Sequence, residues 1–255
     1  MSAARIALLG AVAGLTIFIG LPVGRLRAPM PRVRALLNAL AIGILVFLLW
    51  DVLAAAWEPV EKSVSGHAYL PALGEGAILA AGTGLGLLGL VYFDRWVGRR
   101  AQGSPATLLA LLIAIGIGLH NFAEGLAIGN QAAAGELQLA LMLVIGFGLH
   151  NGTEGFGIVA PLSAAGIRAS WGRLALLGLI GGGPTFFGTV IGQRFTSEPL
   201  SIAFLALAAG SILYVVIELL AVARRFNAKS VTTWGLLGGL LLGFATDAVL
   251  IASGA

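Results

Sequence analysis

Long apolar runs alternate along this chain with short polar segments. The runs hold about 18–25 residues, enough for an α-helix to cross roughly 30 Å of bilayer hydrocarbon. A helix also satisfies its own backbone hydrogen bonds, as a lipid environment requires. The pattern therefore predicts an all-α integral membrane protein with eight transmembrane helices, at residues 5–24, 34–57, 70–93, 106–129, 137–160, 171–194, 200–222 and 232–253.

Composition supports a membrane protein. Of 255 residues, 58% are hydrophobic and only 10% are charged, whereas soluble domains carry roughly 25% charged residues. The 38 glycines suit membrane helices, in which small residues let backbones approach closely. We expect one transmembrane domain over residues 1–255, and the small-residue faces make a homodimer a further expectation. The chain offers no aromatic and basic face for nucleic acid.

The positive charges lie mostly in alternate loops. Twelve of the fifteen Arg and Lys residues fall in the first, third, fifth and seventh loops, and Arg5, Lys62 and Arg194 fall on the other side. The twelve are Arg25, Arg27, Arg32, Arg34, Arg95, Arg99, Arg100, Arg168, Arg173, Arg224, Arg225 and Lys229. Cytoplasmic loops of membrane proteins are rich in such residues. We therefore expect both termini to be extracytoplasmic, in what we interpret as a prokaryotic inner membrane.

A polar motif occurs twice in the middle of the chain. Residues 115–125 and 145–155 both read Ile-Gly-x-Gly-Leu-His-Asn-x-x-Glu-Gly. The two copies fall on consecutive predicted helices, which must be antiparallel, so the copies form an inverted repeat. Inverted repeats that meet near the middle of the membrane are typical of transporters.

The motif provides metal ligands at helical spacing. Residues four apart share a helix face, so each copy would present an imidazole and a carboxylate together, with an amide nearby. Face to face, the copies predict a metal site between the fourth and fifth helices. Its six residues are His120, Asn121, Glu124, His150, Asn151 and Glu154. Imidazole and carboxylate suit zinc, iron and manganese, and two carboxylates balance one divalent cation.

Other acidic residues lie in or near the apolar runs. Asp51 is flanked by apolar residues of the second predicted helix, so we interpret it as a further ligand or cavity residue. Glu58, closer to the external end, could gather cations on the transport pathway, although we favour its interpretation as a solvated charge. Two alternatives to transport stay open here: an intramembrane metal-dependent enzyme and a structural scaffold.

The repeated motif resembles those of the ZIP family of divalent metal transporters. The resemblance implies eight spans, external termini, transport of zinc, or of iron or manganese, toward the cytoplasm, and no cofactor. It also implies that the six motif residues form the transport site and that Glu218 lies on the exit path. This chain departs from the family at Ala123 and Thr153, where proline is usual. It departs again at Gly183, where the family often has glutamate, so we expect one tightly bound metal ion.

Overall fold

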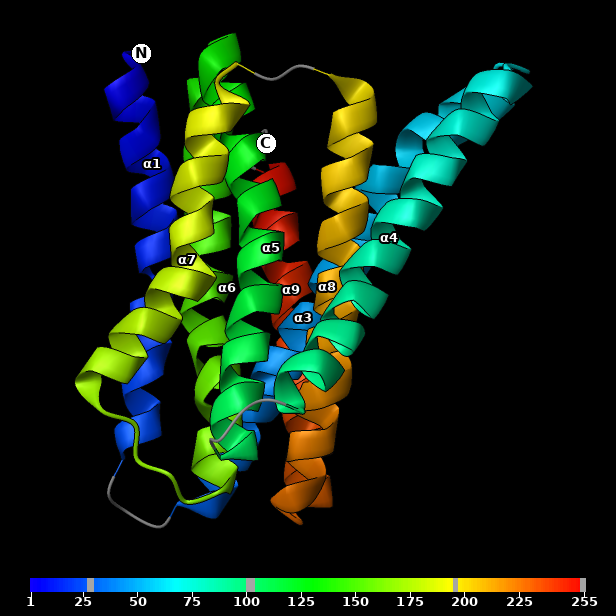
Figure 1. The fold of residues 1–255 in the computed structure, drawn as a ribbon. Coiled ribbons are helices and arrows are strands. Elements are labelled where there is room, and N and C mark those ends of the chain that lie inside the picture. Colours follow the sequence, from blue (N-terminus) through cyan, green and yellow to red (C-terminus); the bar gives the residue numbers. More distant parts are fainter. Residues whose placement is uncertain (27–29, 100–103, 195–196, 253–255) are drawn as a thin grey trace.

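The computed structural model describes residues 1–26, 30–99, 104–194 and 197–252, and these are helical almost throughout (Figure 1). The helices are α1 (Ala3–Leu15), α2 (Ile17–Gly20), the 3-10 helix η1 (Leu21–Arg25), α3 (Pro31–Ser65), α4 (Tyr69–Gly98), α5 (Pro105–Ala134), α6 (Leu137–Ala164), α7 (Trp171–Gly192), α8 (Glu198–Arg225) and α9 (Lys229–Ala252). The described residues contain no strand, which confirms the all-α prediction. Arg27 and Arg100 lie outside the described residues.

Each expected span corresponds to a helical segment. The first is composite, because α1, α2 and η1 follow one another with only Thr16 between α1 and α2. Six segments are long and apolar enough to cross a membrane: Ala3–Arg25, α3, α4, α5, α7 and α8. The expected spans at 137–160 and 232–253 correspond to α6 and α9, which are outside this set of six. In α6 the polar motif residues lower the mean hydropathy.

α3 is longer than expected. The apolar run predicts a helix over 34–57, but α3 has 35 residues and ends at Ser65, with Pro59 inside it. Beyond the apolar run, Lys62 Nζ lies 2.6 Å from Glu58 Oε1, one turn earlier on the same helix. We place the end of the membrane where these charged residues begin. The helix continues beyond that point, because ion pairs between residues four apart stabilise a helix in water.

α5 and α7 pack closely, with α1 against α7, while α3, α8 and α9 lie together and α4 leans away from the bundle (Figure 1). Glycines permit the closest approaches. A Cβ atom added at Gly14 of α1 would lie 2.2 Å from the Gly182 carbonyl oxygen of α7, and one added at Gly182 would lie 2.1 Å from that of Gly14. The Gly-rich segment before Pro184 is therefore a closely packed helix rather than a broken one.

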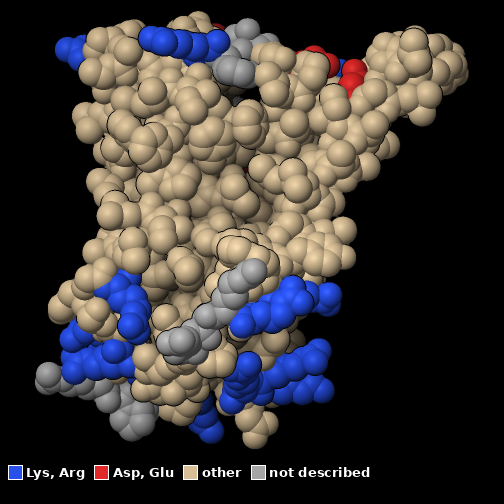
Figure 2. Space-filling model, viewed as in Figure 1, with Lys and Arg blue, Asp and Glu red and all other residues tan. Residues whose placement is uncertain are grey.

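The two ends of the bundle differ in charge. Figure 2 shows most of the visible Lys and Arg side chains gathered at one end, and both termini lie at the other end (Figures 1 and 2). We call the first the basic end. α5 begins there at Pro105 and runs away from it, whereas α6 and α8 run toward it and finish at Ala164 and Arg225.

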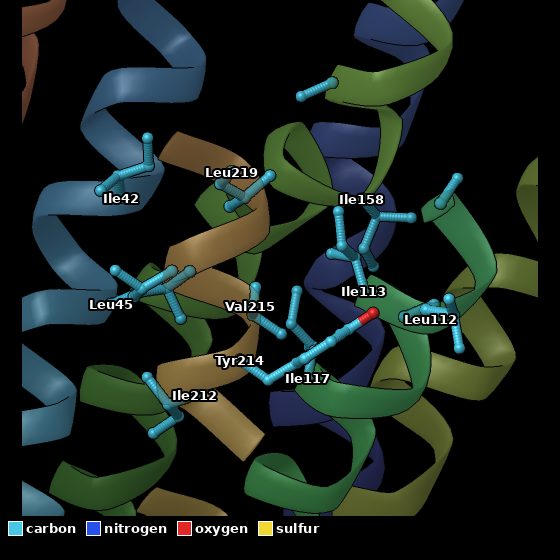
Figure 3. Packing of buried hydrophobic residues seen from close by; sticks show 14 of the residues in the cluster. Ile42, Leu45, Leu112, Ile113, Ile117, Ile158, Ile212, Tyr214, Val215 and Leu219 are labelled. Carbon is cyan, nitrogen blue, oxygen red and sulfur yellow. The ribbon is translucent and has the colours of Figure 1, made fainter. Parts of the chain in front are cut away.

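A buried apolar layer crosses the bundle on the side toward the basic end. It is formed by Ile113 and Ile117 of α5, Ile158 of α6, and Tyr214 and Val215 of α8, and each is at most 2% exposed (Figure 3). On α5 these isoleucines precede His120, and on α6 Ile158 follows Glu154. The layer therefore lies between the motif residues and the basic end.

Candidate metal centre

The first motif copy lies in the middle of α5. His120 and Glu124 are one helical turn apart, and the distance between His120 Nε2 and Glu124 Oε1 is 2.9 Å. Both are buried, with 1% and 5% of the residue exposed. Gly118 lets this part of α5 pack closely against α7. A Cβ added at Gly118 would lie 2.4 Å from the Ile180 carbonyl oxygen. Close packing fixes the motif in the interior of the bundle.

The second copy lies in α6 and faces the first. His150 Nε2 lies 2.5 Å from Glu124 Oε1, so one carboxylate oxygen of Glu124 contacts both histidines. Glu154 is fully buried, and its Oε1 atom is 3.9 Å from His120 Nε2. α6 approaches α2 at Gly155, where an added Cβ would lie 2.4 Å from the Ile17 carbonyl oxygen.

Three of these side chains form a group of the size that a metal ion needs. His120, Glu124 and His150 each offer one ligand atom, and the three atoms lie within 4.8 Å of one another. Further lone pairs are available nearby, because Glu124 Oε2 and Glu154 Oε1 are buried without a hydrogen-bond partner among the described residues. Imidazole and carboxylate together suit a divalent transition metal. The two carboxylates would balance its charge in a site removed from water.

The two asparagines of the motif have different partners. Asn121 Nδ2 donates to Glu154 Oε2 at 3.2 Å and to the Gly181 carbonyl oxygen of α7 at 3.0 Å. Asn151 Nδ2 donates instead to the Ala13 carbonyl oxygen of α1 at 3.2 Å. Asn121 therefore orients a glutamate of the cluster, whereas Asn151 joins α6 to α1. A ligand role for the two amide oxygens stays a prediction.

Comparison with known proteins identifies the family. The model of the ZIP zinc transporter family matches residues 97–251. Zinc transporters ZupT from Salmonella arizonae, Salmonella newport and Salmonella typhimurium are each 31% identical to this chain over 246 residues, which cover 90% of each sequence. The chain belongs to the ZIP zinc transporter family. It is therefore a transporter of divalent metal ions and not an enzyme.

In this ZIP transporter a cavity of about 260 Å³ leads to the second motif copy. We call it the α3/α9 cavity. It is lined by His150 and Thr153 of α6, by Asp51 of α3 and by Asp247 of α9. Asp51 is not a member of the three-residue group that places its ligand atoms within 4.8 Å in the described part of the chain. The structure brings Asp51 to the approach to the centre, beside His150.

Asp247 is not among the site residues expected from the sequence, although the signal was present. Asp247 is an acidic residue inside the last apolar run, as Asp51 is inside the second. What the sequence does not reveal is that α3 and α9 pack side by side, which brings the two carboxylates to one cavity.

A second cavity of this ZIP transporter, of about 310 Å³, opens at the basic end. We call it the α4/α8 cavity. Its lining includes Asp94 of α4, together with Glu218 and Arg225 of α8. Glu218 was expected from the family resemblance, and Asp94 was missed. Asp94 directly precedes Arg95 at the end of an apolar run, a position that reads as an ordinary loop charge until α4 and α8 are seen to pack together.

Glu58 lies away from the metal centre. The side chain of Glu58 is 61% exposed and pairs with Lys62 on the surface of α3, which fits the interpretation of Glu58 as a solvated charge.

Gly183 of α7 also lies away from the centre. Gly181 and Thr185 of α7 are buried, but a Cβ added at Gly183 would meet nothing within 4 Å. Two residues along a helix correspond to a rotation of about 200°. Gly183 therefore lies on the opposite face of α7 from Gly181.

Proposed function

We propose that this transporter moves zinc across the membrane toward the basic end, which we take as the cytoplasmic side. The observation that carries the proposal is the group formed by His120, Glu124 and His150, with Glu154 beside it. These residues offer imidazole and carboxylate ligands in the middle of apolar helices, where a charged group is costly unless it serves a pathway. Iron and manganese have the same ligand preferences and are the alternative substrates.

The two cavities give this proposal a route. On the outer side, the α3/α9 cavity reaches His150 and carries Asp51 and Asp247, which attract a cation. On the inner side, the α4/α8 cavity carries Asp94 and Glu218. A cation would pass from the first pair of carboxylates to the buried centre and then to the second pair.

The arrangement supports an alternating-access mechanism. The apolar layer is buried and separates the centre from the α4/α8 cavity, whereas His150 lines the α3/α9 cavity. A charged ion does not cross a closed apolar layer, because it would lose its hydration without gaining ligands. Release toward the basic end therefore requires α5, α6 and α8 to move apart along this layer.

The test is zinc uptake into sealed vesicles that contain the purified protein and a zinc-sensitive dye. We expect saturable uptake by the wild-type protein, and competition by Fe²⁺ or Mn²⁺ if either is also a substrate. The chain has three histidines, which supply a matched control. The double variant His120→Ala/His150→Ala should lose uptake, and His67→Asn should retain it.

His67 is exposed and lies at the α3–α4 turn with a φ of 58°. Asparagine tolerates this left-handed backbone, so the control variant avoids strain. Equal uptake by the double variant and by the wild-type protein would contradict the proposed centre. Vesicles with wild-type protein that take up no divalent metal would contradict transport itself.

A further inference from the structure

Tyr214 of α8 has a buried hydroxyl group that is not part of the metal centre. The residue is 2% exposed, and its hydroxyl has no hydrogen-bond partner among the described residues. A buried hydroxyl without a partner destabilises a fold relative to a residue without that group. Phenylalanine would occupy the same space without this cost. In this conformation the hydroxyl therefore contributes nothing to the stability of the bundle.

The hydroxyl lies within the apolar layer. In Figure 3 the ring of Tyr214 runs from α8 toward α5, and its oxygen ends beside Leu112 and Ile113. Ile113 is seven residues before His120 and four after Leu109, which lines the α4/α8 cavity. At 1.5 Å per residue, these separations are about 10 Å and about 6 Å along α5. Tyr214 thus places an oxygen between the centre and that cavity.

The α4/α8 cavity is one helical turn beyond Tyr214 along α8. Glu218 follows Tyr214 by one helical turn on α8 and lines the α4/α8 cavity together with Asp94 of α4. The residue therefore stands at the border between the apolar layer and the acidic cavity.

We propose that Tyr214 is a transport-pathway residue whose hydroxyl holds the hydrated cation between the buried centre and the α4/α8 cavity. The proposal rests on the proposed function. When α5 and α8 separate, the hydroxyl oxygen faces the opened path and contacts the passing ion or its water. In the conformation with α5 and α8 apart, the substrate ion or its water is the partner that the hydroxyl lacks here.

A neutral oxygen suits this position. From His120 to Leu109 the path along α5 is about 16 Å, and its other lining residues in the layer are apolar. Conduction requires binding sites that are favourable enough for an ion to occupy but weak enough for it to leave. A carboxylate here would compete with Glu124 and Glu154 for the ion, whereas a hydroxyl lowers the barrier without holding the ion tightly.

The test compares Tyr214→Phe with Tyr92→Phe, its matched control. Tyr92 lies on α4 and is 63% exposed. We measure maximal zinc uptake rate and KM in vesicles, zinc affinity of the purified protein, and the thermal unfolding midpoint. For Tyr214→Phe we expect an uptake rate about tenfold lower, the effect of losing one hydrogen bond to a charged species. Zinc affinity and KM should be unchanged, and the unfolding midpoint should be equal or higher. Tyr92→Phe should match the wild-type protein throughout.

Two results would overturn the inference and leave the proposed function intact. One is an unchanged uptake rate in Tyr214→Phe. The other is a lower rate accompanied by a lower unfolding midpoint or a weaker zinc affinity, because this would mean that the hydroxyl supports the fold or the centre. Absence of uptake by the wild-type protein would overturn the proposed function and this inference together.

Discussion

The two copies of the His-Asn-x-x-Glu-Gly motif have nearly the same sequence but different surroundings. In the first copy Glu124 contacts both histidines, and His120 is 1% exposed. In the second copy Glu154 contacts His120 at the longer distance of 3.9 Å and accepts a hydrogen bond from Asn121. His150 also lines the α3/α9 cavity, which His120 does not.

The difference teaches that a repeated motif need not give repeated roles. The first copy provides the centre of the cluster, because its glutamate bridges the two histidines. The second copy provides His150, which lines the α3/α9 cavity and, in the proposed function, is the side that a cation reaches first. The neighbouring helices make this distinction, since α7 covers the first copy while α3 and α9 leave a cavity beside the second.

The largest expected effect separates the two glutamates. Glu124→Gln should weaken zinc binding by about 100-fold, because it removes the charge that faces both histidines in a poorly solvated site. Glu154→Gln should weaken binding by about tenfold, because Glu154 faces one histidine and Asn121 can still hold the neutral side chain. Isothermal titration of the purified variants with zinc measures both effects.

The control for this pair is Glu61→Gln, a change outside the cluster on the exposed end of α3, which should bind zinc as the wild-type protein does. Equal losses in the two cluster variants would mean that the copies act symmetrically once metal is bound.

The sequence predicts the fold well because the length of each apolar run is a simple guide to the helices of a membrane protein. Apolar length predicts where the helices lie, so each of the eight expected segments corresponds to a helical segment, and six of those in the described residues are long and apolar enough to cross a membrane. The main difference from the expected bounds is the extension of α3 to Ser65. The ligand types follow from helical spacing in the motif. Asp51 and Asp247 line one cavity, and Asp94 and Glu218 line another. This depends on which helices are neighbours, and no local pattern specifies that.

Gly183 illustrates the same limit. Its place beside Pro184 matches the family position that often carries glutamate, and the sequence alone suggests that Gly183→Glu would add a ligand for a second ion. In the structure this position faces away from the buried side of α7. Rotation about the helix axis, set by the packing of α7 on α1 and α5, decides whether a residue reaches the centre.

A smaller effect is expected on the approach to the second copy. Asp51→Asn should raise the KM for zinc uptake about fivefold, because Asp51 lines the cavity that leads to His150, where its charge is poorly screened. Glu58→Gln should change KM less than twofold, because Glu58 is exposed, paired with Lys62 and screened by salt. Vesicle uptake over a range of zinc concentrations measures both values, and equal changes would place Asp51 among the surface charges.

The last comparison concerns the two asparagines, whose loss should affect zinc binding in the first copy and stability in the second. Asn121→Ala should weaken zinc binding by about tenfold, because Glu154 loses the donor that orients it. Asn151→Ala should leave zinc binding within about twofold and instead lower the free energy of unfolding by about 1 kcal/mol, because its buried hydrogen bond joins α6 to α1. Zinc titration and thermal unfolding on the same samples separate the two effects. If Asn151→Ala weakened zinc binding as much as Asn121→Ala, its amide would be a metal ligand, and the bond to Ala13 would have to break when zinc binds.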